Sequence, residues 1–331
     1  MARIVCFGEM MIRLSPPGRE LLLQTPSLRT TIGGAEANVA VSLARFGHDV
    51  RMASVLPDNP LGAAAAAELR RHGVDTRFIA KGAGRMGLYF TTAGAGQRPG
   101  EVLYDRANSA FAQANAYAID WAAALDGAAW LHISGVTPAV SANAGAAALR
   151  AMRQARASGV KISFDANFRS KLWEVRTDDP RQALTPLFAE ADLIFAEARD
   201  ISLITGQRIT SDAEATEIAF DRFPNLDRIA HTTRTVINAD HHELVGHACA
   251  HGGGASSRKH AVTNIVDRIG GGDAFAAGYL HGLSKGMDEA AALDFAVAAA
   301  VLKHSIPGDF NLVSEADVRF YLSDSGADVR R

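Results

Sequence analysis

Three consecutive glycines, Gly270–Gly272, run directly into Asp273 at the start of a segment that predicts a helix. Glycine lets successive backbone N–H groups converge, and a helix N-terminus carries about half a positive charge, so such a turn can hold phosphate oxygens. Asp273 is suited to take a proton from an attacking hydroxyl group, and we expect the helix N-terminus to keep its carboxylate ionised. The spacing leaves a second interpretation open, a flexible loop followed by an acidic residue that favours the helix dipole.

Two further segments place polar side chains at the ends of predicted elements. Gly33–Asn38 precedes an amphipathic helix predicted over Val39–Phe46, and Asn38 offers both a donor and an acceptor to a ligand. A β-to-α turn with a satisfied asparagine explains the same residues. Asp165–Arg169 follows a predicted strand, and ligands of open parallel sheets bind outside the carboxyl ends of the strands. Arg169 could therefore clamp an anion, or it could be an ordinary surface arginine.

Three motif-like patterns are interpreted as structural. Gly82–Gly87 matches the GxGxxG pattern, but β-like residues follow it where a dinucleotide site requires a helix. The four histidines between His241 and His251 lack HExxH spacing, and we expect them to be exposed strand and turn residues. Gly252–Ser257 is expected to be a flexible loop. The sequence has no Gly-Lys pair, which excludes the Walker A motif of P-loop proteins.

The composition is that of an ordinary globular protein. The 331 residues include 34 basic and 36 acidic side chains, so there is no basic excess to hold a nucleic-acid backbone. Only two cysteines occur, Cys6 and Cys249, which suggests a reducing compartment and no disulfide scaffold. No signal-peptide pattern and no apolar run of about 18 residues is present. We expect a cytoplasmic protein without a membrane or nucleic-acid partner.

Short apolar strands alternate with alanine- and leucine-rich helices along most of the chain. This alternation predicts βαβ units and a mostly parallel central sheet flanked by helices. Residues from about 12 to 32 and from about 77 to 106 break the rhythm and predict a small β lid, which includes a hairpin of Leu88–Thr92 with Val102–Tyr104. We expect one domain over residues 1–331, with a polar tail after Tyr321 that frays. The predicted strands are Arg3–Phe7, Val50–Val55, Trp130–Ser134, Lys161–Asp165, Leu193–Ala196 and Ile229–Thr232, and the predicted helices include Ser141–Ala157, Asp273–Leu283, Asp288–His304 and one from Pro60 to Gly73.

Taken together, Gly33–Asn38 and Gly270–Asp273 resemble the two signatures of the ribokinase (PfkB-type) carbohydrate kinase family. The resemblance spans nearly the whole chain, with both motifs in the right order. Finer features resemble the 2-keto-3-deoxygluconate kinase branch of that family; they are Gly8–Leu14, Tyr104–Arg106, Asn167–Trp173 and Pro307–Phe310. The resemblance implies a three-layer ribokinase-like fold with a small β lid. It also implies ATP-dependent phosphorylation of 2-keto-3-deoxygluconate at its terminal hydroxyl to the 6-phosphate, with Mg²⁺ as cofactor.

The resemblance also implies roles for individual residues. Asp273 would be the catalytic base, and Gly270, Gly271 and Gly272 would form the anion hole around the transferring phosphate. Mg²⁺ would bridge the ATP phosphates near Asp200, through water. The substrate pocket would be lined by Gly34, Asn38, Tyr89, Tyr104, Arg106, Asn167, Arg169 and Asp309, and ATP would lie near Thr232, Arg234, Gly270 and Gly272.

The two arginines of the implied substrate pocket favour a sugar acid. Arg106 and Arg169 could both face a carboxylate, and an acceptor without one would leave a desolvated guanidinium unpaired. Arg169 could instead serve an ATP phosphate. The open alternatives are a fructokinase or the kinase of the galactonate epimer, a non-catalytic sugar-binding regulator, and a Rossmann-type reductase built on Gly82–Gly87.

Three positions depart from the family pattern. Gly271 replaces the usual alanine of the anion hole, and Glu197 replaces an amide in the motif that organises metal and phosphate. Val297 falls where relatives often carry an asparagine near the adenine, so no polar adenine contact is assigned there. We also expect a homo-oligomer that associates through the lid, since an exposed sheet invites edge or face pairing.

Overall fold

The computed structural model describes residues 1–176 and 178–323. The last helix, α13 (Glu315–Leu322), includes Tyr321, so the chain is ordered slightly beyond the predicted start of the tail. The remainder of that predicted tail, residues 324–331, lies outside the described residues.

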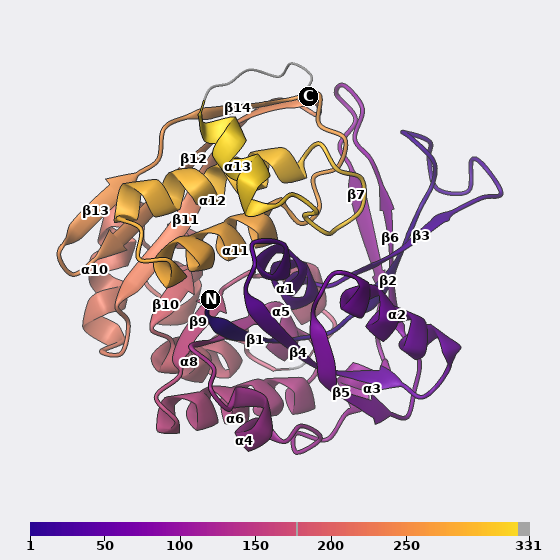
Figure 1. The fold of residues 1–331 in the computed structure, drawn as a ribbon, viewed down its shortest axis with the longest axis horizontal. Coiled ribbons are helices and arrows are strands. Elements are labelled where there is room, and N and C mark those ends of the chain that lie inside the picture. Colours follow the sequence, from indigo (N-terminus) through magenta and orange to yellow (C-terminus); the bar gives the residue numbers. More distant parts are fainter. Residues whose placement is uncertain (177, 324–331) are drawn as a thin grey trace.

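A ten-stranded sheet forms the centre of the molecule (Figure 1). From β11 to β5 its neighbouring strands run parallel, and β12, β13 and β14 extend it in antiparallel fashion. The central strands are buried along continuous apolar runs, as expected for strands covered on both faces. In spatial order the strands are β13 (Gly253–Ser256), β12 (His241–Ala250), β11 (Arg228–Asn238), β10 (Leu193–Phe195), β9 (Lys161–Asp165), β8 (Trp130–Ser134), β1 (Arg3–Phe7), β4 (Asp49–Pro57) and β5 (Asp75–Gly82), with β14 (His260–Thr263) beside β12.

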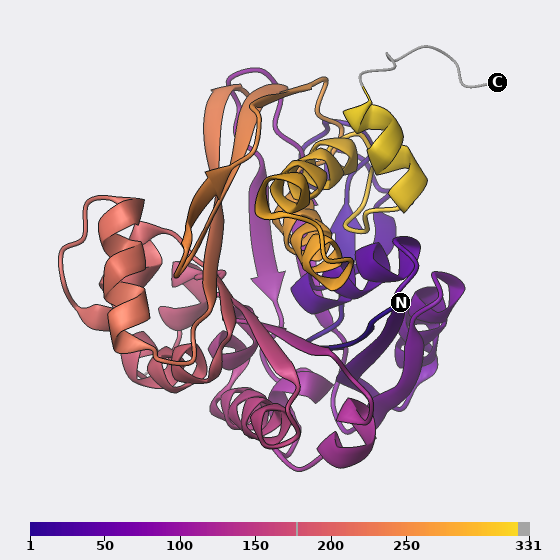
Figure 2. The same ribbon diagram turned by 60° about the vertical axis from the view of Figure 1, so that its left-hand side comes forward.

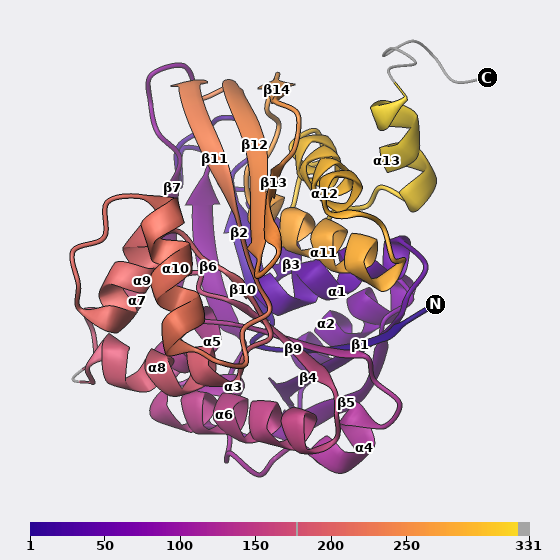
Figure 3. The same cartoon turned by 90° about the vertical axis from the view of Figure 1, so that its left-hand side faces the viewer.

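Helices cover both faces of this sheet and give three layers, each face with its own apolar core (Figure 3). On one face lie α1 (Ala35–Arg45), α2 (Pro60–Arg71), α11 (Gly271–Ser284), α12 (Glu289–Lys303) and α13. On the other lie α3 (Ala110–Gln113), α4 (Trp121–Leu125), α5 (Val136–Val140), α6 (Ala142–Ala157), α7 (Ser170–Trp173), α8 (Pro180–Glu190), α9 (Ala198–Thr205) and α10 (Asp212–Arg222). The predicted three-layer α/β class is confirmed.

Helix ends follow the capping residues in the sequence. The side chain of Asn59 accepts hydrogen bonds from two backbone amides of the first turn of α2, and Ser141 and Asp288 cap α6 and α12 in the same way. Helix α1, however, begins at Ala35 and not at Val39 as predicted. Gly34 has a φ of 147°, which ends the preceding strand abruptly, so the helix starts directly after it and Asn38 lies in its first turns.

A second, four-stranded sheet forms the predicted lid. Its order is β3 (Arg29–Gly33), β2 (Met11–Ser15), β6 (Gly87–Thr92) and β7 (Glu101–Asp105), and the predicted hairpin is the antiparallel pair β6–β7. The predicted boundary at residue 77 is wrong. Residues 77–82 belong to β5, whose parallel pairing with β4 places them in the main sheet.

The lid touches the far end of the main sheet across the molecule (Figures 2 and 3). The Nη1 and Nη2 atoms of Arg19 donate hydrogen bonds of 3.0 and 2.6 Å to the Asp240 carboxylate, and the Ala239 amide donates to the Gly96 carbonyl at 3.2 Å. These contacts join the lid loops to the tip of the β11–β12 hairpin. The lid therefore forms a roof that spans the space above the carboxyl ends of the parallel strands.

Two predictions about the β12–β13 region are wrong. His242 is fully buried, because β12 alternates inward and outward residues and His242 shares the inward face with Leu244. Burial and the nearby cations of Arg268 and Arg234 lower its pKa to about 4, so it is neutral at physiological pH. Gly253–Ser256 is the edge strand β13 and not a loop, since it pairs with His247–Ala250.

Candidate active site

A cleft of about 1200 Å³ opens between the carboxyl ends of the parallel strands and the lid sheet. Every site residue predicted from the sequence lies on its wall; these are Gly34, Asn38, Tyr89, Tyr104, Arg106, Asn167, Arg169, Asp200, Thr232, Arg234, Gly270, Gly271, Gly272, Asp273 and Asp309. They come from the start of α1, the lid strands and their ends, the segments that follow β9 and β10, β11, the start of α11, and the loop between α12 and α13. The fold thus gathers in one place residues that lie far apart in the sequence.

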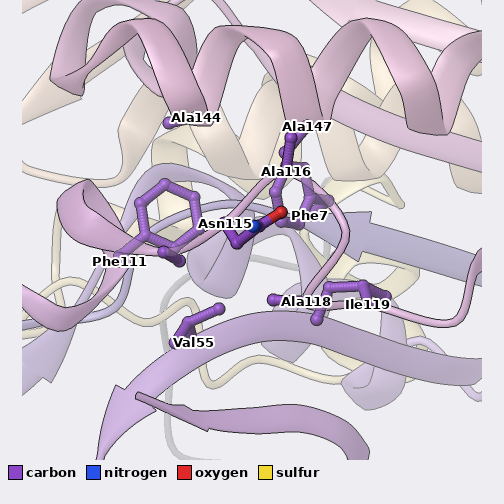
Figure 4. Close-up of a pocket in the computed structure, with 10 residues that line it drawn as sticks. Phe7, Val55, Phe111, Asn115, Ala116, Ala118, Ile119, Ala144 and Ala147 are labelled. Atoms are coloured by element: carbon purple, nitrogen blue, oxygen red, sulfur yellow. The ribbon is translucent and has the colours of Figure 1, made fainter. Parts of the chain in front are cut away.

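A second cavity lies in the apolar core between α6 and β4 (Figure 4). Phe7, Phe111 and Ile119 are among its mainly apolar lining residues, and its volume is about 10 Å³. One water molecule needs about 10–15 Å³, so this cavity has no room for a substrate. The cleft is the candidate active site.

Asp273 lies in the first turn of α11 and faces the cleft. Its Oδ2 accepts a hydrogen bond of 2.7 Å from the Asn38 side-chain amide, which fixes the carboxyl group. The sequence predicted that the helix N-terminus keeps Asp273 ionised, but in the structure its carboxyl group is only partly ionised at neutral pH. Burial raises the pKa of Asp273 to about 7, outweighing the Asn38 hydrogen bond and the attraction of Arg169. The half-buried Asp165 nearby has its pKa raised to about 8, mainly because its surroundings desolvate the charged form.

The floor of the cleft contains an ion-pair network that the sequence did not predict. Arg13 on β2 pairs with Asp309 at 2.9 Å and with Asp267 at 2.7 Å, and all three side chains are less than 10% exposed. Tyr89 on β6 donates a hydrogen bond to Asp309. Asp309 therefore lies on the cleft wall, but Arg13 and Tyr89 already bond its carboxylate. The Asp267 carboxylate also accepts from the backbone amides of Ile269 and Gly308.

The two arginines expected to face a carboxylate have different surroundings. Arg106 is 6% exposed, and its Nε donates to Glu9 at 2.7 Å, so its charge already has an internal counter-ion. Arg169 is exposed on the cleft wall, and in the described part of the chain no carboxylate lies within ion-pair distance of it. The positive charge of Arg169 is near enough to Asp165 and Asp273 to lower the pKa of both carboxyl groups, against the larger effect of burial. Of the two arginines, Arg169 has the guanidinium that is free to bind an anion.

Residues 1–313 match the pattern of the pfkB family carbohydrate kinases. The chain belongs to this family. It is 35% identical, over its full length and 99% of the relative, to a 2-dehydro-3-deoxygalactonokinase of Haloferax volcanii. It is also similar to the crystal structure of a 2-dehydro-3-deoxygluconokinase from Thermotoga maritima, with a TM-score of 0.92, 38% identity and coverage of 97% of this chain and 98% of that one. A structure of a PfkB family carbohydrate kinase from Listeria grayi also gives a TM-score of 0.92 and 38% identity, over 97% of this chain and 100% of that chain.

Within this carbohydrate kinase, the turn before Asp273 explains one departure from the family pattern. Gly270 has a φ of 84°, and a Cβ atom there would lie 2.1 Å from the Asp309 carbonyl oxygen. A Cβ at Gly271 would lie 2.7 Å from the His304 ring, so the imidazole fills the space that the methyl group of an alanine would need. A Cβ at Gly272 would meet nothing within 4 Å, because this residue faces the open cleft. Glycine at position 271 is thus matched to His304.

The other end of the kinase cleft carries cations and two carboxylates. Arg234 and Arg268 repel each other, and burial with this repulsion lowers the pKa of Arg234. The Asp200 carboxylate accepts a hydrogen bond of 2.9 Å from the Glu197 amide and so caps α9. Among the described residues, no cluster of three or more His, Cys, Asp or Glu side chains could hold a metal ion. No helix in the described ranges is long and apolar enough to cross a bilayer.

Proposed function

We propose that this carbohydrate kinase transfers the γ-phosphate of ATP to the terminal hydroxyl of 2-dehydro-3-deoxygluconate and forms the 6-phosphate. The observation that carries the proposal is the unpaired guanidinium of Arg169 on the same cleft wall as Asp273. A sugar-acid carboxylate would satisfy this guanidinium, whereas a neutral sugar would leave it unpaired. Relatives named for kinases of keto-deoxy sugar acids support this acceptor class.

Asp273 acts as the base in the proposed reaction. With the acceptor under the lid, its carboxylate takes the proton of the attacking hydroxyl, while Asn38 holds the carboxylate in place. Gly270–Gly272 line the cleft at the start of α11, and the amides of this helix N-terminus stabilise the charge on the transferring phosphate. The lid roof excludes water, which would otherwise accept the phosphate.

The donor lies at the end of the cleft that contains Thr232 and Arg234. Its triphosphate is balanced by Arg234 and Arg268, and Arg169 is the third cation within reach if the acceptor does not use it. Glu197 and Asp200 offer the hard oxygen atoms that Mg²⁺ prefers, but they are too few to form a cage of protein ligands. The residues fit a magnesium ion held mainly by phosphates and water, which would neutralise the developing phosphate charge.

A second acceptor is supported by a specific observation. The Haloferax volcanii relative that is 35% identical over the whole chain is named for the galactonate epimer. The two acids differ only at one carbinol centre, and both carry the carboxylate that Arg169 would bind.

A panel of acceptors tests the proposal. ADP release is measured with ATP and Mg²⁺ and with 2-dehydro-3-deoxygluconate, its galactonate epimer, fructose or ribose as acceptor. We expect kcat/KM for the keto-deoxy acids to exceed that for fructose and ribose by about 100-fold, because closure of the lid over a neutral sugar would desolvate the Arg169 guanidinium without giving it a partner. Arg169→Met should remove most of this preference. Faster turnover of fructose or ribose by the wild-type enzyme would refute the sugar-acid acceptor.

The activity should follow the ionisation of Asp273. A base works only when deprotonated, and burial raises the pKa of Asp273 to about 7. We therefore expect kcat/KM, which reports the free enzyme, to fall about tenfold per pH unit below pH 7 and to level off above it. Asp165, whose pKa is raised to about 8, is itself mostly protonated below pH 7, so Asp165→Asn should leave this acid limb in place. An acid limb near pH 4 in both proteins would mean that Asp273 is ionised throughout.

Association through the lid and a cytoplasmic location stay predictions. The edge strand β7 of the lid sheet exposes Leu103, whose exposed fraction is 61%, so an apolar side chain is available for a second copy. Both cysteines are free thiols, which agrees with a reducing compartment. Sedimentation of the wild-type protein beside Leu103→Glu would show whether a dimer exists and whether the lid forms it.

A further inference from the structure

Lys303, the last residue of α12, is a lysine with no exposed surface. Burying an ammonium group costs free energy unless hydrogen bonds and opposite charges compensate it. Its Nζ donates a hydrogen bond of 3.0 Å to the carbonyl oxygen of Ile306. An apolar side chain would fill the same space without the cost of desolvation, so the charge itself calls for an explanation.

The side chain of Lys303 lies directly beneath the glycine turn of the active site. A Cβ atom built at Gly270 would lie 3.3 Å from its Cε, closer than an ordinary van der Waals contact. The end of α12 is also joined to the segment that leads into this turn, since the His304 carbonyl accepts hydrogen bonds from the amides of Val266 and Asp267. Lys303 thus packs against the turn that leads into Asp273 and holds its backbone in place.

The charges around Lys303 belong to the active site. The carboxylates of Asp267, Asp309 and Asp273 favour its charged form, Arg13 opposes it, and burial is the largest effect and lowers its pKa. Within this group, Arg13 already pairs with Asp267 and Asp309. Lys303 is therefore the second internal cation of the group, and it lies on the side of the Gly270 turn.

We propose that Lys303 is a positioning residue for phosphoryl transfer. Its ammonium group is a fixed internal cation that holds the Gly270 turn in place and adds positive potential at the transferring phosphate and at Asp273. The proposal deepens the proposed function and, where it concerns the base, rests on it. It predicts that the charge of Lys303 acts selectively on the γ-phosphate and on the protonation of Asp273, which a purely structural lysine would not do.

Binding of nucleotides tests the proposal without any acceptor. Isothermal titration with Mg²⁺ compares ATP and ADP on the wild type and on Lys303→Met, which keeps the length of the side chain and removes its charge. We expect ATP affinity to fall about tenfold and ADP affinity to change less than about threefold, because the added potential is local to the γ-phosphate. Equal losses for both nucleotides, or none, would overturn the proposal. Because no acceptor is present, the result stands even if the wild type phosphorylates none of the sugar acids offered.

Kinetics with the best acceptor gives the second readout. Lys303→Met should lower kcat about 100-fold, as loss of one anion-hole donor commonly does, and should move the acid limb of kcat/KM to higher pH by about one unit. The groups that face Asp273 and remain unchanged are Glu36 and Asn38 of α1, Asp165 and Arg169 after β9, and Asp309. Lys285→Met, in a lysine that is 42% exposed beyond the end of α11, is the matched control and should behave as the wild type. An unmoved acid limb in Lys303→Met would overturn the proposal.

Two further variants cover the case in which Lys303→Met does not fold. Lys303→Ala leaves space for a small cation, so methylammonium should restore part of its activity, whereas tetramethylammonium at the same ionic strength should not. Asp267→Asn removes a negative charge and keeps an oxygen acceptor for one of the two amides, of Ile269 and Gly308, that the carboxylate binds. It should therefore move the acid limb in the opposite direction, to lower pH. The proposal would be overturned if methylammonium did not restore activity to Lys303→Ala and if the acid limb of kcat/KM in Asp267→Asn stayed at its wild-type pH.

Discussion

Asp273→Asn is expected to lower kcat by about 100- to 10,000-fold, the usual contribution of a positioned general base. The amide has almost the same shape as the carboxyl group, and its oxygen can still accept the hydrogen bond from Asn38. The acceptor should therefore still bind, and KM should change by less than about threefold. Coupled measurement of ADP release at saturating ATP and acceptor gives both quantities.

Asp165→Asn is the matched control for this variant. It removes a neighbouring carboxylate of the same cleft whose pKa is also raised by burial, but which accepts a backbone hydrogen bond from Asn167 and is not proposed to meet the acceptor. We expect it to keep kcat within about tenfold of the wild type at pH 8. If Asp165→Asn lost as much activity as Asp273→Asn, or if Asp273→Asn remained fully active, the assignment of the base would be wrong.

The stability of Asp273→Asn should change in the opposite sense to its activity. Since the folded-state pKa of Asp273 is raised to about 7, the folded protein binds this proton more tightly than the unfolded chain does. Stability from the carboxyl group is therefore present at low pH and is lost as the pH rises through about 7. At pH 8 the wild type must hold a charged carboxylate in a desolvated place, whereas asparagine is neutral. The variant should therefore unfold at the same denaturant concentration as the wild type or at a higher one.

Arg13→Met is expected to lower the free energy of unfolding by about 3–5 kcal/mol, the cost of leaving a buried charge without its partner. Arg13 bonds both Asp267 and Asp309, and all three side chains are almost fully enclosed. Methionine fills most of the volume but removes the guanidinium that pairs with both carboxylates, and Lys303 then remains as a cation that interacts with the two of them. Urea unfolding followed by circular dichroism measures the loss.

Two variants bracket this result. Arg13→Lys keeps the charge but offers a single ammonium in place of two guanidinium nitrogens, so it should be destabilised less than Arg13→Met. Arg19→Met removes an exposed ion pair with Asp240, and it should lower the free energy of unfolding by about 0–1 kcal/mol. If the free energy of unfolding of Arg13→Met were within about 1 kcal/mol of the wild-type value, the prediction would be wrong. Asp267 and Asp309 would then take up protons or water at little cost.

Local patterns predicted the elements that lie near the site. The strands Arg3–Phe7, Trp130–Ser134 and Lys161–Asp165 are found with the predicted bounds, because continuous apolar runs between turn residues determine where a buried parallel strand begins and ends. The glycines Gly270–Gly272 indicated the helix that carries Asp273, although α11 begins at Gly271, two residues before the predicted start. Glycines in such a turn can be recognised from the sequence, since glycine adopts positive φ, as Gly270 does, and allows close approach of the backbone without a steric penalty.

Long-range partners could not be predicted in this way. Arg13 reads as a polar interruption of the apolar β2 strand, and nothing near it in the sequence indicates Asp267 or Asp309. Lys303 resembles the basic last residue of any helix. The same limit explains the pKa of Asp273, because the helix dipole is a local property, whereas burial depends on elements from both ends of the chain.

The ion pair between Arg13 and Asp309 joins residues 296 positions apart, and it has a consequence for how the enzyme is made. During translation, the chain that carries Arg13 leaves the ribosome first, and its counter-ions are among the last residues to be synthesised. The lid strand and the glycine turn can be locked together only after the C-terminal segment has arrived. A nascent or truncated chain that lacks Asp309 therefore cannot form this ion pair, and we expect phosphoryl transfer from ATP only by chains that extend beyond this residue.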